Sequence, residues 1–199
     1  MNRRNFCLSS LATAISGAAV AAGCLPTGER AALRVHASAA GAQLYKFVYD
    51  RRYPAARSFG AAAEHAPSSG GVVAIRGDIT ELWSRDLEPK WRTGGGAIAG
   101  LTSARTLLCL EQLARDQWMR VAIRTEHAML AGQKIAHRLT ASEPMIARMT
   151  WALAAEDWAQ KLPAALATCW DAVGAGAGLA IGPTCRLATE DALVSFVIA

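Results

Sequence analysis

The chain of 199 residues has few charged side chains, at 19%, and few aromatic ones, at 7%, whereas 52% of its residues are hydrophobic. This combination excludes a largely disordered protein, which would be richer in charge and poorer in apolar residues. No internal repeat recurs at a fixed spacing, and this excludes a solenoid or a fibre. The length therefore fits one compact domain better than two.

Several motifs of well-understood chemistry are also missing. There is no C-x-x-C, which excludes a thioredoxin-type redox pair and a c-type haem site, and there is no Walker A sequence or G-x-S-x-G elbow. The glycines at 94–96 precede an expected strand, and those at 174–178 do not open a helix, so neither run has the context of a dinucleotide fingerprint. His36 lies in an expected tether, and His65 and His137 lie in expected helices with no cysteine or carboxylate at ligand spacing. We therefore expect no cofactor and no metal ion.

The N-terminus of the chain has the features of an export signal. Arg3 and Arg4 precede a short, weakly apolar run over 9–22 that ends in small residues, the pattern of an export signal. The segment at 3–8, RRNFCL, resembles the twin-arginine translocation signal, although Asn2 replaces the usual hydroxyl residue and Cys7 the usual leucine. The apolar run is too short and too rich in small residues to anchor the chain as a transmembrane helix.

Two cleavage sites fit this signal. The segment at 21–24 resembles a lipoprotein box, which would lipidate Cys24, and 19–21 is an ordinary A-x-A site, which would release a soluble protein. With either cleavage site, the protein is expected in the periplasm, in solution or tethered to the membrane. Removal of 1–23 lowers Lys+Arg from 21 to 19 against 16 acidic residues, so the net charge falls from +5 to +3. That charge is too small to indicate a nucleic-acid partner.

The resemblance to the twin-arginine signal implies partners as well as a route. The family's cargo folds before export and is often a cofactor enzyme, or a subunit exported together with one. The expected partners are therefore the twin-arginine export machinery and, beyond it, a co-exported redox enzyme subunit.

The remainder of the chain divides into a tether over 25–42 and one α/β domain over 43–199. Apolar and β-branched runs predict strands at 44–49, 72–75, 97–101, 120–124 and 192–198. Helices are predicted at 54–63, 79–86 and 104–117, followed by a mostly helical segment over 128–171 and a glycine-rich loop over 174–182. Single helices between strands predict βαβ crossovers. The expected fold is thus a three-layer domain with a mainly parallel sheet, an added C-terminal helical segment and a final strand.

Ligands of open parallel sheets bind beyond the carboxyl ends of the strands. The residues that follow the expected strands are polar, and their guanidiniums and helix N-termini favour an anionic small molecule. The candidates for ligand binding are Arg51, Arg52, Asp78, Thr102, Ser103 and Arg124. His127 is the best catalytic candidate, with Asp50 or Glu126 as its acid–base partner. The alternative is that these residues are helix caps and ordinary loop polarity.

Cysteine and tryptophan positions give three further expectations. Cys109 lies among leucines and is expected to be a buried thiol. Cys169 and Cys185 flank the glycine-rich loop and could form a disulfide outside the cytoplasm. Trp151 and Trp158 are seven residues apart and are expected to share one buried helical face.

These observations favour an exported accessory or ligand-binding α/β protein that acts beside a redox enzyme system. One alternative is a small cofactor-independent enzyme acting on an anionic molecule at the strand ends. The other is a structural lipoprotein without a ligand.

Overall fold

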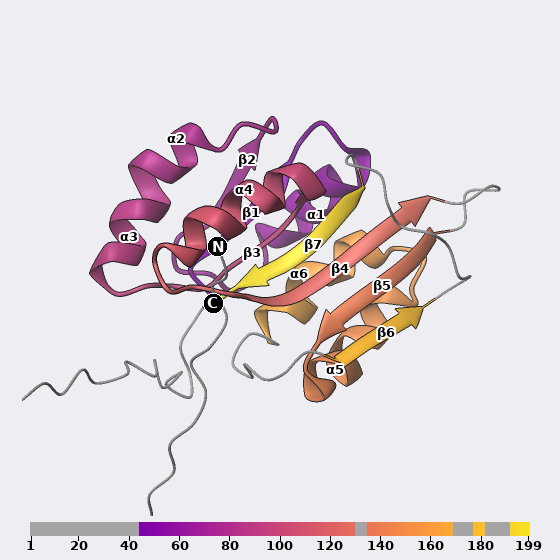
Figure 1. The fold of residues 1–199 in the computed structure, drawn as a ribbon. Helices are drawn as coiled ribbons and strands as arrows, with labels where there is room; N and C mark the ends of the chain where they lie inside the picture. The colour runs from indigo at the N-terminus through magenta and orange to yellow at the C-terminus, as the bar shows by residue number, and fades with distance from the viewer. Residues whose placement is uncertain (1–43, 130–134, 169–176, 182–191) are drawn as a thin grey trace, which may run out of the picture. The chain divides into compact units, whose positions relative to one another are not determined.

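The computed structural model describes residues 44–129, 135–168, 177–181 and 192–199. The predicted signal and tether, Cys24, Cys169 and Cys185 lie outside these residues. The described strands form a seven-stranded sheet with the order β2-β1-β3-β7-β4-β5-β6 (Figure 1). The strands are β1 (Lys46–Asp50), β2 (Val72–Ile75), β3 (Ile98–Ser103), β4 (Val121–Met129), β5 (Ile135–Ala141), β6 (Ala177–Ile181) and β7 (Leu193–Ile198).

The helices lie between and after these strands. They are α1 (Pro54–Ala63), α2 (Thr80–Leu82), the π-helix η1 (Trp83–Leu87), α3 (Glu88–Thr93), α4 (Ala104–Arg115), α5 (Glu143–Leu153) and α6 (Trp158–Ala167). None of the helices in the described ranges combines the length and the hydropathy needed to cross a membrane.

The chain is mixed α/β, as predicted, but its sheet is not mainly parallel. β1 pairs in parallel with β2 and with β3, whereas the other four neighbouring pairs are antiparallel. The difference has two causes. The C-terminal strand β7 lies between β3 and β4 and is antiparallel to both, and β5, the next described element after β4, pairs with β4 as an antiparallel neighbour.

The predicted helical segment over 128–171 is wrong in its first part. β4 continues to Met129, and β5 occupies residues 135–141 of the segment predicted to be mostly helical. The burial of β5 alternates, with Leu139 and Ala141 inside and Arg138 and Thr140 outside, which is the period of a strand. β6 likewise occupies part of the predicted glycine-rich loop.

Two hydrophobic clusters hold the domain together, and alternation along the strands divides side chains between them. Phe47 belongs to the cluster under α1, α5 and α6, while the next residue, Val48, belongs to the cluster under α2, α3 and α4. Figure 1 shows α4 in front of β1 and β3, with α6 behind the sheet. Over β4 and β5, the second face carries the charged side chains of Arg124, Glu126 and Arg138 instead of a cluster.

Trp151 and Trp158 do not share a helical face. Trp151 is 53% exposed on α5, whereas Trp158 is buried at the start of α6, and residues 154–157 separate the two helices. Pro163 lies inside α6 without ending it. Cys109 is exposed rather than buried, because the buried side of α4 is formed by other residues, including Leu107 and Leu110.

Candidate functional site at the carboxyl edge of the sheet

The carboxyl ends of β1, β2 and β3 meet at one edge of the sheet, as the sequence predicts. The backbone N–H of Arg51 donates to Ile75 O at 3.0 Å, so the residues that follow β1 and β2 are adjacent. The guanidinium of Arg52 lies so close to Gly77 that a Cβ there would stand 2.5 Å from Nη2. Thr106 Oγ1 donates to Gly77 O at 3.4 Å and brings in the first turn of α4. We call residues 50–52, 76–80 and 103–106 the carboxyl edge.

Asp50 has a structural part at this edge. Its side chain is fully buried, and Arg52 covers it, with 2.6 Å between Nη2 and Oδ2 and 3.0 Å from Nε to either oxygen. The backbone N–H of Arg52 donates a further hydrogen bond of 3.1 Å to Oδ1. Because all of these bonds lie within one short turn, Asp50 fixes the position of Arg52 and is not presented to a ligand.

The hydroxyl groups that follow β3 are also engaged inside the protein. Ser103 caps α4, since its Oγ accepts from the backbone N–H of Thr106 at 3.2 Å. Thr102 is fully buried, and its Oγ1 donates to Ser103 O at 3.3 Å. Of the residues predicted to bind a ligand, Thr102 and Ser103 therefore shape the edge without facing solvent.

The exposed side chains of this region are mostly cationic. Asp78 is exposed, and its Oδ1 accepts from Thr80 N at 2.8 Å and from Thr80 Oγ1 at 2.7 Å, bonds that lower the pKa of this carboxyl. Four exposed arginines belong to the carboxyl edge, on the turns after β1 and β2 and in the first turn of α4: Arg51, Arg52, Arg76 and Arg105. Arg57 on α1 adjoins them, since its Nη1 donates to Arg51 O at 3.0 Å. Four arginines against Asp50 and Asp78 give the residues of the carboxyl edge a net charge of +2, which suits an anion.

Arg124, Glu126 and His127 do not join this group of arginines. The sequence placed them after a strand, but β4 continues through all three. Arg124 and Glu126 lie on the face opposite His127, where Arg124 Nε is 3.4 Å from Glu126 Oε1 and Arg138 Nη1 is 3.6 Å from Glu126 Oε2. Asp50 is separated from β4 by β3 and β7, or roughly 14 Å at the usual strand spacing. The structure therefore brings His127 to neither of its predicted acid–base partners.

His127 instead belongs to a buried polar cluster with His137, Ser195 and Trp158. Its Nδ1 lies 2.7 Å from Nδ1 of His137, and its Nε2 lies 3.0 Å from Ser195 Oγ. The indole of Trp158 stacks on the His127 ring with centroids 4.3 Å apart and an interplanar angle of 24°. The signal for this cluster was present in the chain, because His127 and His137 face each other across β4 and β5 once residues 135–141 are recognised as a strand.

A serine, a histidine and a second histidine in this order have the arrangement of a nucleophile, its base and an orienting group. Ser195, however, is fully buried in β7, and Trp158 covers the His127 ring. Ser195 therefore cannot attack a substrate in this conformation, and we regard the cluster as an internal polar network.

The burial of this network keeps its histidines neutral. Desolvation, together with the neighbouring His137, lowers the pKa of His127 far below its ordinary value, and desolvation lowers the pKa of His137 to about 4. In neutral solution one Nδ1 consequently donates its proton to the other. Among the described residues, Thr125 Oγ1 is buried beside this network without a hydrogen-bond partner.

Within the described ranges, no group of three or more histidine, cysteine, aspartate or glutamate side chains is arranged to hold a metal ion. No protein-family model, curated protein or solved structure matches the chain.

Proposed function

We propose that this protein is an exported binding protein that holds a small anion at the carboxyl edge. The observation that carries the proposal is the contact of three separate segments there: Arg52 against Gly77, and Gly77 bonded to Thr106. This contact gathers exposed guanidiniums from turns and helices that are distant in sequence. Carboxylate and phosphate are the anions that guanidinium groups bind best, through two parallel hydrogen bonds.

The chemistry at this edge favours binding over catalysis. A guanidinium keeps its proton in neutral water and neither accepts nor releases one during a reaction. Asp50 is committed to Arg52 and Ser103 to the cap of α4, so both are occupied within the protein. The edge can thus orient and neutralise an anion with groups that remain charged.

The twin-arginine resemblance supports the cellular part of the proposal. The protein would reach the periplasm folded, in solution or lipid-anchored through Cys24, and would act as an accessory to a redox enzyme exported by the same route. Replacement of both signal arginines, Arg3→Lys with Arg4→Lys, should leave the precursor in the cytoplasm, as seen by fractionation and immunoblotting. Continued export of the double variant would refute the route without affecting the binding site.

The binding site is tested by titration calorimetry of the full chain with inorganic phosphate and with butyrate. Arg105 and Arg115 offer a matched pair, because both are exposed and occupy the first and the last turn of α4. We expect Arg105→Gln to weaken binding about tenfold, the scale of a hydrogen bond to a charged group, and Arg115→Gln to leave affinity unchanged. Equal affinities in the two variants, or no binding of either anion to the unaltered chain, would overturn the proposal.

A further inference from the structure

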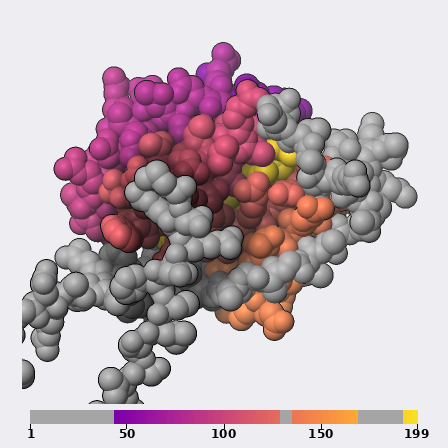
Figure 2. All heavy atoms as spheres, viewed as in Figure 1, coloured from indigo at the N-terminus to yellow at the C-terminus, as the bar shows by residue number. Residues whose placement is uncertain are grey.

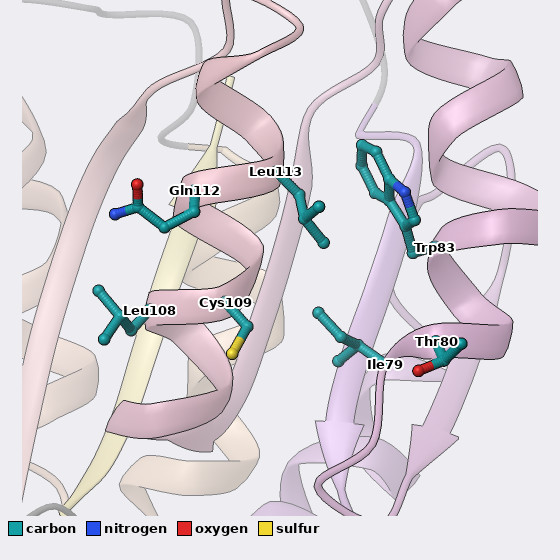
Figure 3. A pocket seen from close by; sticks show the side chains of 7 residues that line it. All are labelled: Ile79, Thr80, Trp83, Leu108, Cys109, Gln112 and Leu113. Carbon is teal, nitrogen blue, oxygen red and sulfur yellow. The ribbon is translucent and has the colours of Figure 1, made fainter.

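An apolar groove lies between α4 and the segment that contains α2 and η1. Its volume is about 540 Å³, and its lining is formed by Ile79, Thr80, Trp83, Leu108, Cys109, Gln112 and Leu113 (Figure 3). Leu113 and Trp83 lie across the groove from each other, and Cys109 and Ile79 likewise come from its two opposite walls. In the space-filling view, α4 and the residues near position 80 reach the molecular surface (Figure 2). Leu108 is 55% exposed, so this apolar lining is open to solvent.

The groove begins at the carboxyl edge. Ile79 and Thr80 directly follow Asp78, and the bonds from Thr80 to Asp78 fix this turn. On α4, Arg105 precedes Leu108 and Cys109 by three and four residues, which places all three on one side of the helix. A charged end and an apolar body are therefore adjacent parts of one surface.

The opposite wall of the groove has an unusual backbone. The π-helix η1 begins at Trp83, and short π-helical turns inside helical segments are frequent at functional sites. The Trp83 ring packs edge-on against the buried Trp91, with centroids 5.9 Å apart and an angle of 69°. The contact with Trp91 holds the Trp83 ring in place as the aromatic part of the groove lining.

We infer that the ligand of the carboxyl edge is an amphiphilic anion, a free small molecule with one carboxylate or phosphate on a hydrocarbon chain. The anionic group would lie at the edge beside Arg105, and the chain would lie along Leu108, Leu113 and Trp83. This inference rests on the proposed binding function and adds the class of ligand. The volume is that of a site for one small molecule, so we assign it to a free amphiphile and not to a lipid held in a bilayer.

Cys109 provides a direct probe of the groove, since its thiol is free, exposed and part of the lining. The full chain is alkylated with iodoacetamide in the presence of octanoate, butyrate or octanol, and the rate at Cys109 is followed by peptide mass spectrometry. We expect octanoate to slow alkylation at Cys109 at least about fivefold at saturation. Butyrate has four fewer carbons to cover the groove and should slow alkylation much less than octanoate does.

Calorimetry with octanoate and butyrate measures how much the hydrocarbon chain of the ligand contributes to binding. Each methylene that leaves water strengthens binding about fourfold, so cover of about three additional methylenes predicts roughly 60-fold tighter binding of octanoate than of butyrate. Leu108→Asn should reduce this ratio several-fold, because it removes apolar surface from the groove. Trp151→Asn is the control, since Trp151 is similarly exposed but lies on α5. Both substituted side chains are more than half exposed, so neither change should unfold the protein.

The outcomes separate this inference from the function on which it rests. If butyrate and phosphate bind but octanoate binds no tighter and does not protect Cys109, the inference is wrong and the anion site stands. If octanol protects Cys109 as well as octanoate does, and Arg105→Gln does not weaken anion binding, the groove binds neutral apolar molecules. In that case both the proposed anion-binding function and the inferred amphiphilic ligand are wrong. Protection by octanoate alone that is weakened by Arg105→Gln and by Leu108→Asn would support both.

Discussion

The buried pair His127 and His137 predicts how the stability of the domain depends on pH. Both pKa values are lower in the folded chain than the ordinary value of about 6.5, which the unfolded chain should show. Below that pH the unfolded state binds more protons than the folded state, so acid favours unfolding. The stabilisation is fully present above about pH 6.5 and is lost as the pH falls toward the folded pKa values.

The size of the effect follows from proton linkage. A histidine that is protonated only in the unfolded state costs about 1.4 kcal/mol for each pH unit below its unfolded pKa. Between pH 8 and pH 5 this amounts to about 2 kcal/mol for each histidine and about 4 kcal/mol for the pair. A loss of 4 kcal/mol is a large share of the roughly 5–15 kcal/mol that stabilises a typical domain.

The assay is urea unfolding of the full chain, followed by circular dichroism at several pH values from 8 to 5. The double variant His127→Leu, His137→Leu removes both titrating groups together, which avoids leaving one imidazole without its partner. Between pH 8 and pH 5, the histidine pair should lower the free energy of unfolding of the unaltered chain by about 4 kcal/mol. The double variant lacks both histidines and should not show this decrease. Leu108→Asn is the control, because it changes an exposed side chain that does not titrate and should keep the original dependence. Equal pH dependence in the double variant and the unaltered chain would refute the assignment of neutral, buried histidines.

Three other substitutions test the carboxyl edge and the core. Gly77→Ala should destabilise the domain more than Gly71→Ala in thermal melting, because both glycines have positive φ, at +85° and +71°, but only Gly77 faces the Arg52 guanidinium; equal shifts would contradict the contact. Arg52→Ala should cost about 2–3 kcal/mol by leaving the carboxylate of Asp50 buried without its cation, whereas the exposed Arg51→Ala should cost under about 0.5 kcal/mol. Trp158→Ala should cost about 3–5 kcal/mol by opening a cavity over His127, and Trp151→Ala about 1 kcal/mol or less; similar losses at both tryptophans would show that Trp158 is not part of the core.

The first half of the fold could be predicted from local patterns. The apolar runs at β1, β2 and β3 are short and bounded by turn residues, and Ser103 is a recognisable cap for α4. These elements alternate along the chain, so the parallel order of β2, β1 and β3 follows from the crossover rule. The carboxyl edge was consequently found where the sequence placed it.

The second half could not be predicted in this way, because its elements depend on partners far away in the chain. The strand β5 contains alanine, histidine and leucine, which suit a helix equally well, and it is stabilised as a strand by pairing with β4 and β6. The composition of β7 does not indicate that it pairs between β3 and β4, because these partners are distant in the sequence. The cluster of His127, His137 and Ser195 arises only from these pairings, and for this reason the local sequence pairs His127 with Asp50 or Glu126 instead.

The most direct test of the central claim is a nuclear magnetic resonance titration of the full, isotope-labelled chain with octanoate. A ligand at the carboxyl edge and along the groove predicts that the largest amide shifts fall at residues 76–83 and 103–113, with Gly77 and Thr106 among them. Arg105→Gln should reduce all of these shifts together at a fixed octanoate concentration. Largest shifts on β4 and β5, or no shifts at saturating octanoate, would contradict the proposed site.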